Sequence, residues 1–259
     1  MSITIAVTGK GGVGKTTISA LMLQWLVAHK ATPVLAVDAD SNANLNEALG
    51  LSYSASVGGI REDARRQAKE LAGVAKQEFL DLRVQEALVE QDGFDLIVMG
   101  RPEGPGCYCF ANNVLRDVIK RLADNYRYIV VDSEAGLEHL SRRTLLTVDH
   151  LCIVSDCTVR GVRTARRIAE LTAEMGTPVA DCGLIVNRVP GGILPAAVRD
   201  EAEASGLTLL AVIPMDDNVA ALDAGGIAVG DIPDDAPARQ AVNALMERVH
   251  DKELLNVKR

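Results

Sequence analysis

The sequence predicts an α/β fold in which a doubly wound, mostly parallel sheet is flanked by helices. Two observations support this fold class: short aliphatic runs recur along the chain, and stretches with helical periodicity separate them. Most of the runs are apolar at consecutive positions, which is typical of strands buried on both faces. The expected strands are Ile3–Val7, Pro33–Val37, Leu96–Met99, Tyr128–Val131, Leu151–Val154, Gly183–Val186 and Leu209–Ile213. The expected helices are Thr16–His29, Glu78–Glu90, Asn112–Asn125, Gly161–Met175, Pro195–Ser205 and Pro237–His250.

The chain is expected to form a single domain over residues 1–259. Single α/β domains often reach this length, and no Ser-, Gly- or Pro-rich linker divides the sequence. Hydrophobic residues make up 48% and charged residues 24%, a balance that excludes a disordered chain and a coiled coil. One stretch, Ser52–Lys76, mixes both charges with small residues, and we expect it to be an exposed helical insertion.

The charge balance and the cysteine usage limit the partners and the compartment. Lys and Arg number 27 against 35 Asp and Glu, so the net charge is −8, which argues against non-specific nucleic-acid binding. No apolar stretch of about 18 residues is present, and the N-terminus lacks a basic region and a cleavage site. Five cysteines at irregular spacing are typical of reduced thiols. We therefore expect a cytoplasmic protein with no nucleic-acid or membrane partner.

A phosphate-binding loop follows the first expected strand and opens the first expected helix. The segment GKGGVGKT at residues 9–16 fits the pattern G-x-x-x-x-G-K-[ST]. Glycines let backbone N–H groups approach phosphate oxygens, and the helix N-terminus adds positive potential at the same place. Lys15 can reach the β- and γ-phosphates, and the Thr16 hydroxyl can bind Mg²⁺. The expected nucleotide contacts here are Gly9, Lys10, Gly11, Gly12, Val13, Gly14, Lys15, Thr16 and Thr17.

Lys10 is a second lysine at the start of this loop. Because Lys15 already occupies the phosphates, Lys10 is better placed to reach a nucleotide on a facing subunit, as a trans-acting finger does. At this residue the sequence resembles the deviant Walker A, or SIMIBI, class of P-loop ATPases, which includes MinD, ParA and the nitrogenase iron protein. The resemblance implies a homodimer that forms around bound nucleotide, with Lys10 and Lys15 acting in ATP hydrolysis.

Two acids end the second expected strand. Asp38 and Asp40 lie where the carboxyl ends of parallel strands gather ligands, close to the phosphate loop. We expect Asp38 to hold Mg²⁺ through water and Asp40 to orient the attacking water. The resemblance supports the second role, since the aspartate of switch I falls on Asp40. Asp40 or Ser41 is also expected to cap a helix over Asn42–Leu49.

A third acid, Asp132, ends the apolar strand Tyr128–Val131, which is the Walker B pattern. We expect it to meet Mg²⁺ in the second coordination shell. Gly136 follows in a segment, Glu134–His139, that we interpret as switch II, because a glycine peptide near the γ-phosphate can rotate and sense that group.

The adenine site carries weaker signals. Asn187 ends a late strand, and the resemblance puts an asparagine amide on the adenine edge at this position. Asn187 as a plain turn residue is the alternative. Pro214 ends the last strand, where the backbone is expected to line the base pocket.

Cys107 and Cys109 stand out because they lie in a Gly/Pro-rich loop, before a helix expected to start near Ala111. A helix N-terminus lowers a thiol pKa and so favours metal binding, whereas a disulfide two residues apart would be strained. One chain supplies two thiolates and a closed sulfur site usually needs four, which two facing chains would supply. The other three cysteines, Cys152, Cys157 and Cys182, are expected to be core or strand-end residues.

The segments RPEGPGCYCFANNVLR at residues 101–116 and DSEAGLEHLSR at residues 132–142 closely resemble the CooC-type nickel-insertion ATPases, along nearly the whole chain. The resemblance implies Ni²⁺ on Cys107 and Cys109, with Zn²⁺ as a substitute, and a nickel–iron–sulfur client, either carbon monoxide dehydrogenase or acetyl-CoA synthase. It also implies ATP or ADP and Mg²⁺, with Thr16 and Asp132 on the magnesium ion.

Two other functions stay open at this point. A MinD/ParA-like positioning ATPase would need a membrane or DNA surface, which the acidic charge and the short C-terminal segment Glu253–Arg259 disfavour. An iron–sulfur scaffold or electron carrier would also use Cys107 and Cys109 from two chains. Neither thiolate chemistry nor the affinity order of the divalent metals singles out nickel.

Overall fold

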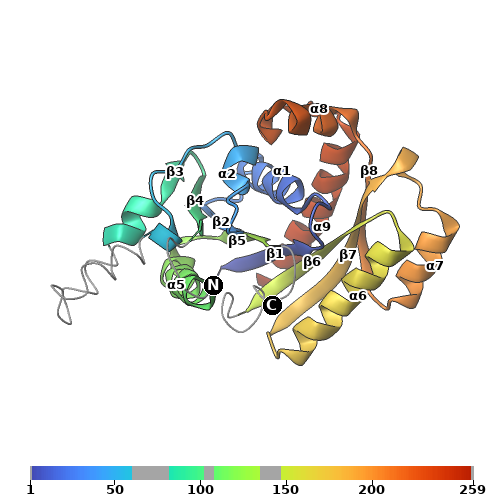
Figure 1. Ribbon diagram of the computed structural model, residues 1–259, viewed down its shortest axis with the longest axis horizontal. Helices are drawn as coiled ribbons and strands as arrows, with labels where there is room; N and C mark the ends of the chain where they lie inside the picture. The colour runs from blue at the N-terminus through green and yellow to red at the C-terminus, as the bar shows by residue number, and fades with distance from the viewer. Residues whose placement is uncertain (1, 60–81, 102–107, 135–146, 258–259) are drawn as a thin grey trace.

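The computed structural model describes residues 2–59, 82–101, 108–134 and 147–257, which are built around an eight-stranded sheet (Figure 1). The strand order is β3-β4-β2-β5-β1-β6-β7-β8, and every neighbouring pair is parallel except β3 with β4. The strands are β1 (Ile3–Gly9), β2 (Val34–Ala39), β3 (Val89–Gln91), β4 (Phe94–Val98), β5 (Tyr128–Ser133), β6 (Val148–Asp156), β7 (Val179–Val189) and β8 (Thr208–Pro214). The predicted fold class is confirmed.

Helices cover both faces of this sheet (Figure 1). Alternate residues of a strand point to opposite faces, so in β1 Ile5 packs in one core cluster and Ala6 in the other. The Ile5 cluster contains α1 (Lys15–Ala28) and α9 (Pro237–Val257). The Ala6 cluster contains α5, α6 and α7, which span Tyr108–Leu122, Val159–Glu174 and Ala196–Ala204. The shorter helices are α2 (Leu45–Ala48), α8 (Asp217–Gly225) and three 3₁₀ turns, Ala123–Asn125, Pro190–Gly192 and Val229–Asp231.

The structure corrects the predicted elements in three places. The expected helix Glu78–Glu90 is helical at residues 82–87, but Val89–Gln91 is strand β3, which forms a hairpin with β4 through a turn at Asp92 and Gly93. The helix expected over Asn42–Leu49 is the shorter α2, whose N-cap residue is Asn44. Helix α8 was not predicted at all. Most of the expected insertion, its residues 60–76, lies outside the described residues.

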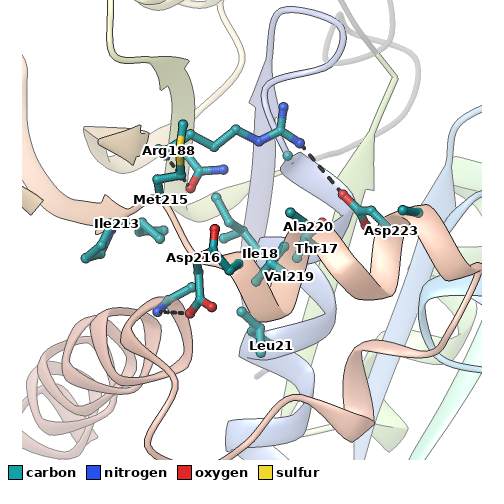
Figure 2. Close-up of a pocket in the computed structure, with 16 residues that line it drawn as sticks. Thr17, Ile18, Leu21, Arg188, Ile213, Met215, Asp216, Val219, Ala220 and Asp223 are labelled. Carbon is teal, nitrogen blue, oxygen red and sulfur yellow. Dashed lines mark hydrogen bonds and ion pairs between the residues drawn. The ribbon is translucent and has the colours of Figure 1, made fainter. Parts of the chain in front are cut away.

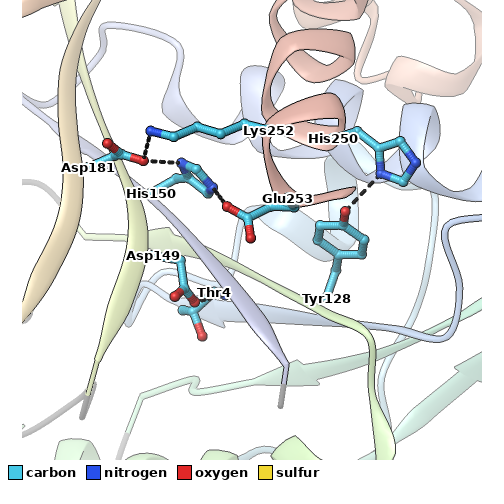
Figure 3. Close-up of polar contacts among 8 residues, drawn as sticks. All are labelled: Thr4, Tyr128, Asp149, His150, Asp181, His250, Lys252 and Glu253. Atoms are coloured by element: carbon cyan, nitrogen blue, oxygen red, sulfur yellow. Dashed lines mark hydrogen bonds and ion pairs between the residues drawn. The ribbon is translucent and has the colours of Figure 1, made fainter. Parts of the chain in front are cut away.

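Hydrogen bonds and ion pairs connect the C-terminal helix α9 to the amino-terminal edge of the sheet (Figure 3). His150 of β6 lies 2.7 Å from Glu253 through its Nε2 atom, and Tyr128 of β5 lies 2.8 Å from Nδ1 of His250. Lys252 forms an ion pair with an aspartate of β7. Within the described ranges, no helix is long and apolar enough to cross a membrane.

Candidate functional site

The candidate site lies at the carboxyl edge of the sheet, around the loop that follows β1. Strand order places β5 and β2 on one side of β1 and β6 on the other, so the chain winds in both directions from this point. In doubly wound sheets, ligands bind at such a switch point because the loops on its two sides diverge and leave a crevice.

Two glycines let the phosphate loop pass close to neighbouring strands. Gly9 has φ of 151°, and a Cβ added there would lie 2.2 Å from the carbonyl oxygen of Val154. Gly14 has φ of 93°, and its added Cβ would lie 2.4 Å from Nδ2 of Asn187. Larger residues at both positions would meet strained backbone and steric overlap at once. The loop path therefore depends on glycine at these two positions.

Lys15 begins helix α1 and is buried within the loop. Its Nζ donates to the carbonyl oxygen of Lys10 at 3.2 Å. Burial lowers the pKa of Lys15, although the carboxylates of Asp132, Asp40 and Glu134 act in the opposite direction. The Lys10 side chain, by contrast, is exposed to solvent. The two lysines therefore face different surroundings, one buried within the loop and one in solvent.

Asp132 is a buried carboxylate that meets the first turns of α1. The Thr16 hydroxyl donates to one of its oxygens at 2.7 Å, and the Ser19 hydroxyl donates to the other at 3.2 Å. Burial raises the pKa of Asp132 to about 6, while these hydrogen bonds and Lys15 act to lower it. Thr16 and Asp132, two predicted site residues, are thus in direct contact.

Asp38 is fully buried beside Asp132. The two residues are directly opposite each other in the β2–β5 register. Burial, and to a smaller extent the charge of Asp132, raises the pKa of Asp38 to about 7. Hydrogen bonds from the backbone N–H groups of Asp40 and Leu45 act to lower it. Asp38, not Asp40 or Ser41, accepts from the first residue of α2. This corrects the predicted cap.

Asp40 lines the cavity over the phosphate loop. One of its carboxylate oxygens accepts from the backbone N–H of Asn42 at 2.8 Å, which fixes the local turn. The cavity has a volume of about 720 Å³ and is also lined by Gly12, Lys15 and Glu134. Asp40 therefore faces the same cavity as Lys15 of the phosphate loop.

A second cavity of about 550 Å³ adjoins the first (Figure 2). It contains two predicted residues, Asn187 and Pro214, between apolar side chains of α1 and α8. Residues that line both cavities are Gly14, Thr17, Arg188 and Asp223. Through these shared residues the two cavities form one cleft, in which the first cavity is lined by the phosphate loop and the second mostly by apolar side chains, an arrangement that suits a nucleotide.

Arg188 and Asp223 were not predicted as site residues. The Arg188 guanidinium donates to the carbonyl oxygen of Gly12 at 3.0 Å and lies 3.8 Å from an Asp223 oxygen, across the cleft (Figure 2). A basic residue near the end of an expected strand was the one available signal for Arg188. Asp223 had none, because it lies in α8, a short helix whose apolar residues are only partly buried.

Several predicted residues lie outside the described part of the chain. These are Cys107, Gly136 and most of the expected switch II segment, residues 135–139. Cys109 falls within α5, which begins at Tyr108 and not near Ala111. Among the described residues, no group of three or more His, Cys, Asp or Glu side chains could hold a metal ion.

The remaining cysteines have the expected positions. Cys152 is buried in β6, where burial raises the pKa of its thiol to about 12. Cys182 is partly buried within β7, and Cys157 directly follows β6. Burial also raises the pKa of both these thiols, so none of the three is activated as a thiolate.

Comparison with known proteins places this site in a family. The model of the CobQ/CobB/MinD/ParA nucleotide binding domain (CbiA) matches residues 4–229. An uncharacterized ATP-binding protein of Methanocaldococcus jannaschii is 39% identical over 96% of this chain and 98% of its own length. The carbon monoxide dehydrogenase accessory protein CooC of Rhodospirillum rubrum is 33% identical over 95% of this chain and 97% of its own length.

Solved structures agree in fold. The septum site-determining protein MinD of Pyrococcus horikoshii, determined with Mg-ADP, is 22% identical with a TM-score of 0.71, covering 100% of this chain and 99% of that one. The Cyanothece McdA(D38A)–ATP complex is 18% identical with a TM-score of 0.72, covering 95% of both chains. Because the family model matches residues 4–229, the chain belongs to the CobQ/CobB/MinD/ParA family of P-loop nucleotide-binding ATPases.

Proposed function

We propose that the protein is a Mg²⁺-dependent ATPase that binds Ni²⁺ between two copies of the chain and delivers it to a nickel–iron–sulfur enzyme. The observation that carries the proposal is the pair Cys107 and Cys109 in a chain that is 33% identical to CooC over 95% of its length. ATPase motifs alone do not call for such a pair. The client is carbon monoxide dehydrogenase or acetyl-CoA synthase.

The cleft supports ATP and ADP as the nucleotides. The polar cavity over the phosphate loop suits the phosphates, and the apolar cavity beside Asn187 and Pro214 suits the base. Thr17 lines both cavities and would lie near the sugar and α-phosphate. A nucleotide in this position has its γ-phosphate beside Lys15 and Asp40, where hydrolysis would take place.

The carboxyl edge also suits Mg²⁺. Hydroxyl and carboxylate oxygens are the ligands this ion prefers, and Thr16, Asp132 and Asp38 provide them within one cluster. The raised pKa values of Asp38 and Asp132 reflect buried negative charge that a cation would compensate. We assign Thr16 as the direct ligand, with Asp132 and Asp38 acting through water. When bound there, Mg²⁺ would supply positive charge against the phosphate oxygens.

Hydrolysis transfers the γ-phosphoryl group to water. Asp40 orients the attacking water, and Lys15 offsets the charge that develops on the γ-phosphate. Lys10 of the opposite chain adds a second positive charge, and its exposed side chain leaves it free to reach across an interface. The Gly136 peptide senses whether the γ-phosphate is present.

Nickel is the cargo of this cycle. Two chains with two thiolates each would supply the four sulfur ligands of a closed site, so capture would follow the dimer that ATP assembles. Zn²⁺ would occupy the same thiolates as a substitute. We assign the whole chain, residues 1–259, to this one domain, acting in the cytoplasm without nucleic acid or membrane.

Titration with Ni²⁺ tests the proposal directly. Wild-type protein with ATP should bind about one ion per two chains, and Cys107→Ala and Cys109→Ala should each abolish binding. Cys157→Ala is the matched control and should bind as wild type. Full nickel stoichiometry in either loop variant would remove the cysteine assignment.

Sedimentation tests the dimer separately. The Lys10→Ala variant should stay monomeric with ATP yet bind nucleotide as tightly as wild type, because Lys10 acts only across the interface. ATP-dependent dimers in this variant, as abundant as in wild type, would contradict that role.

A further inference from the structure

The end of strand β7 holds the phosphate loop through two successive carbonyl groups. Asn187 donates from Nδ2 to the carbonyl oxygen of Val13 at 2.8 Å. Its neighbour Arg188 donates from its guanidinium to the carbonyl oxygen of Gly12 at 3.0 Å. Both contacts join residues more than 170 positions apart in the sequence. Neither contact requires a bound nucleotide, so the loop is held before any ligand arrives.

Holding these carbonyls also fixes the direction of two N–H groups. In a planar trans peptide the C=O of one residue and the N–H of the next point in opposite directions. When Arg188 holds the Gly12 carbonyl, the N–H of Val13 must point away from β7. The Asn187 contact fixes the N–H of Gly14 in the same way. These are amides of the loop whose N–H groups are expected to bind phosphate.

The local backbone is arranged for this contact. Arg188 has φ of 56°, in the left-handed region that favours glycine, so its conformation is held by its surroundings. The Asn187 side chain is buried, and its Oδ1 accepts from the N–H of Arg188 at 2.8 Å. The Asn187 amide lies so close to Gly14 that a Cβ at this position would overlap with it. Asp223 of α8, 3.8 Å from the guanidinium, supports Arg188 from the other side of the cleft (Figure 2).

We propose that Asn187 and Arg188 form a brace that preorganises the phosphate loop, so that both are positioning residues for oligophosphate binding. The inference rests on the proposed nucleotide site. It goes beyond the adenine role expected for Asn187, because the brace acts on phosphates whether or not a base is attached. A loop that is already in its binding conformation avoids the entropy cost of ordering when the anion binds.

Magnesium tripolyphosphate, which has no base and no sugar, is the probe that separates these roles. Its affinity for the full chain, measured by titration calorimetry, should fall about tenfold in Asn187→Ala and in Arg188→Ala, the size expected for losing one such hydrogen bond. Arg188→Lys keeps one donor and should recover part of the loss. Arg199→Ala is the matched control: this arginine also bonds a backbone carbonyl, that of Leu194, away from the loop.

Hydrogen exchange of the ligand-free protein distinguishes a brace from direct contact with phosphate. In both variants, amides of the peptide spanning residues 9–17 should exchange faster than in wild type, whereas a direct phosphate contact would leave this exchange unchanged. Unchanged exchange, or unchanged tripolyphosphate affinity with weakened ATP binding, would overturn the brace. Wild-type protein that binds ATP but not tripolyphosphate would also overturn it. Wild-type protein that binds neither would overturn the proposed nucleotide site itself.

Discussion

The two edges of the sheet handle polar and charged side chains in opposite ways. At the amino-terminal edge, each group meets a complementary one: His150 meets Glu253, Lys252 meets Asp181, and Tyr128 meets His250 (Figure 3). At the carboxyl edge, the acids Asp38 and Asp132 lie side by side, and the pKa of each is raised.

The difference separates stability from function. Paired groups at the amino-terminal edge fasten α9 and call for no further partner. When ionised, the acids at the carboxyl edge carry a cost of desolvation and mutual repulsion, which a bound cation would offset and which a sheet edge built for stability alone would avoid. The carboxyl edge is therefore the one arranged for a ligand, and changes at the two edges should have separable effects.

The largest expected effect follows from removing Lys15. In Lys15→Ala the affinity for ATP or the rate of hydrolysis should fall by about 100-fold or more, because the buried ammonium is placed to meet negative charge that develops on the γ-phosphate. Lys252→Ala, at the opposite edge, is the control and should change neither quantity. Phosphate release and nucleotide titration measure both. Equal losses of ATP affinity or turnover in the two variants would contradict the functional difference between the two edges.

A smaller effect concerns pH. The pKa values of Asp38 and Asp132, about 7 and about 6, exceed the ordinary value of 3.8, so the folded chain holds more protons than the unfolded chain in this interval. Their contribution to the free energy of unfolding is greatest below about pH 4 and is lost as the pH rises to about 7.

The variant Asp132→Asn removes one acid and the repulsion that acts on the other. The decrease in the free energy of unfolding between about pH 5 and pH 8 should therefore shrink by about 2 kcal/mol. Urea denaturation without nucleotide or Mg²⁺ measures it, and Asp234→Asn, at a fully exposed acid, is the control. An unchanged pH dependence in Asp132→Asn would mean that the two acids do not interact.

The third effect lies at the amino-terminal edge. His150→Ala leaves the mostly buried Glu253 carboxylate without its 2.7 Å partner, which should lower the free energy of unfolding by about 2 kcal/mol. ATP turnover per folded molecule should stay the same. Denaturation and phosphate release on one preparation test both statements. Lost turnover with unchanged stability would reverse the roles of the edges.

The strand ends of the site could be predicted because their signals are local. An apolar run followed by an acid marks β2 and β5, and the glycine pattern marks the loop after β1. The contact between Asp38 and Asp132 could not be predicted, because it depends on β5 inserting between β1 and β2. The left-handed Arg188 and its contact with Gly12 depend on the path of β7 in the same way.

The missed elements lack the patterns that sequence reasoning uses. Strand β3 has three residues, of which Glu90 is charged, and it follows a helical stretch without a break. The pair Asp92–Gly93 was the overlooked signal, since this dipeptide favours two-residue hairpin turns. Helix α8 has no buried residue, and only its cap, Asp216, could have indicated where it starts.

Phosphate release from ATP by wild-type protein and by Asp40→Asn tests the central claim most directly. We expect Mg²⁺-dependent release by the wild type, and loss of release in Asp40→Asn with ATP affinity unchanged, because the variant can still bind nucleotide but cannot orient the attacking water. Release by Asp40→Asn at the wild-type rate, or none by the wild type, would contradict the account.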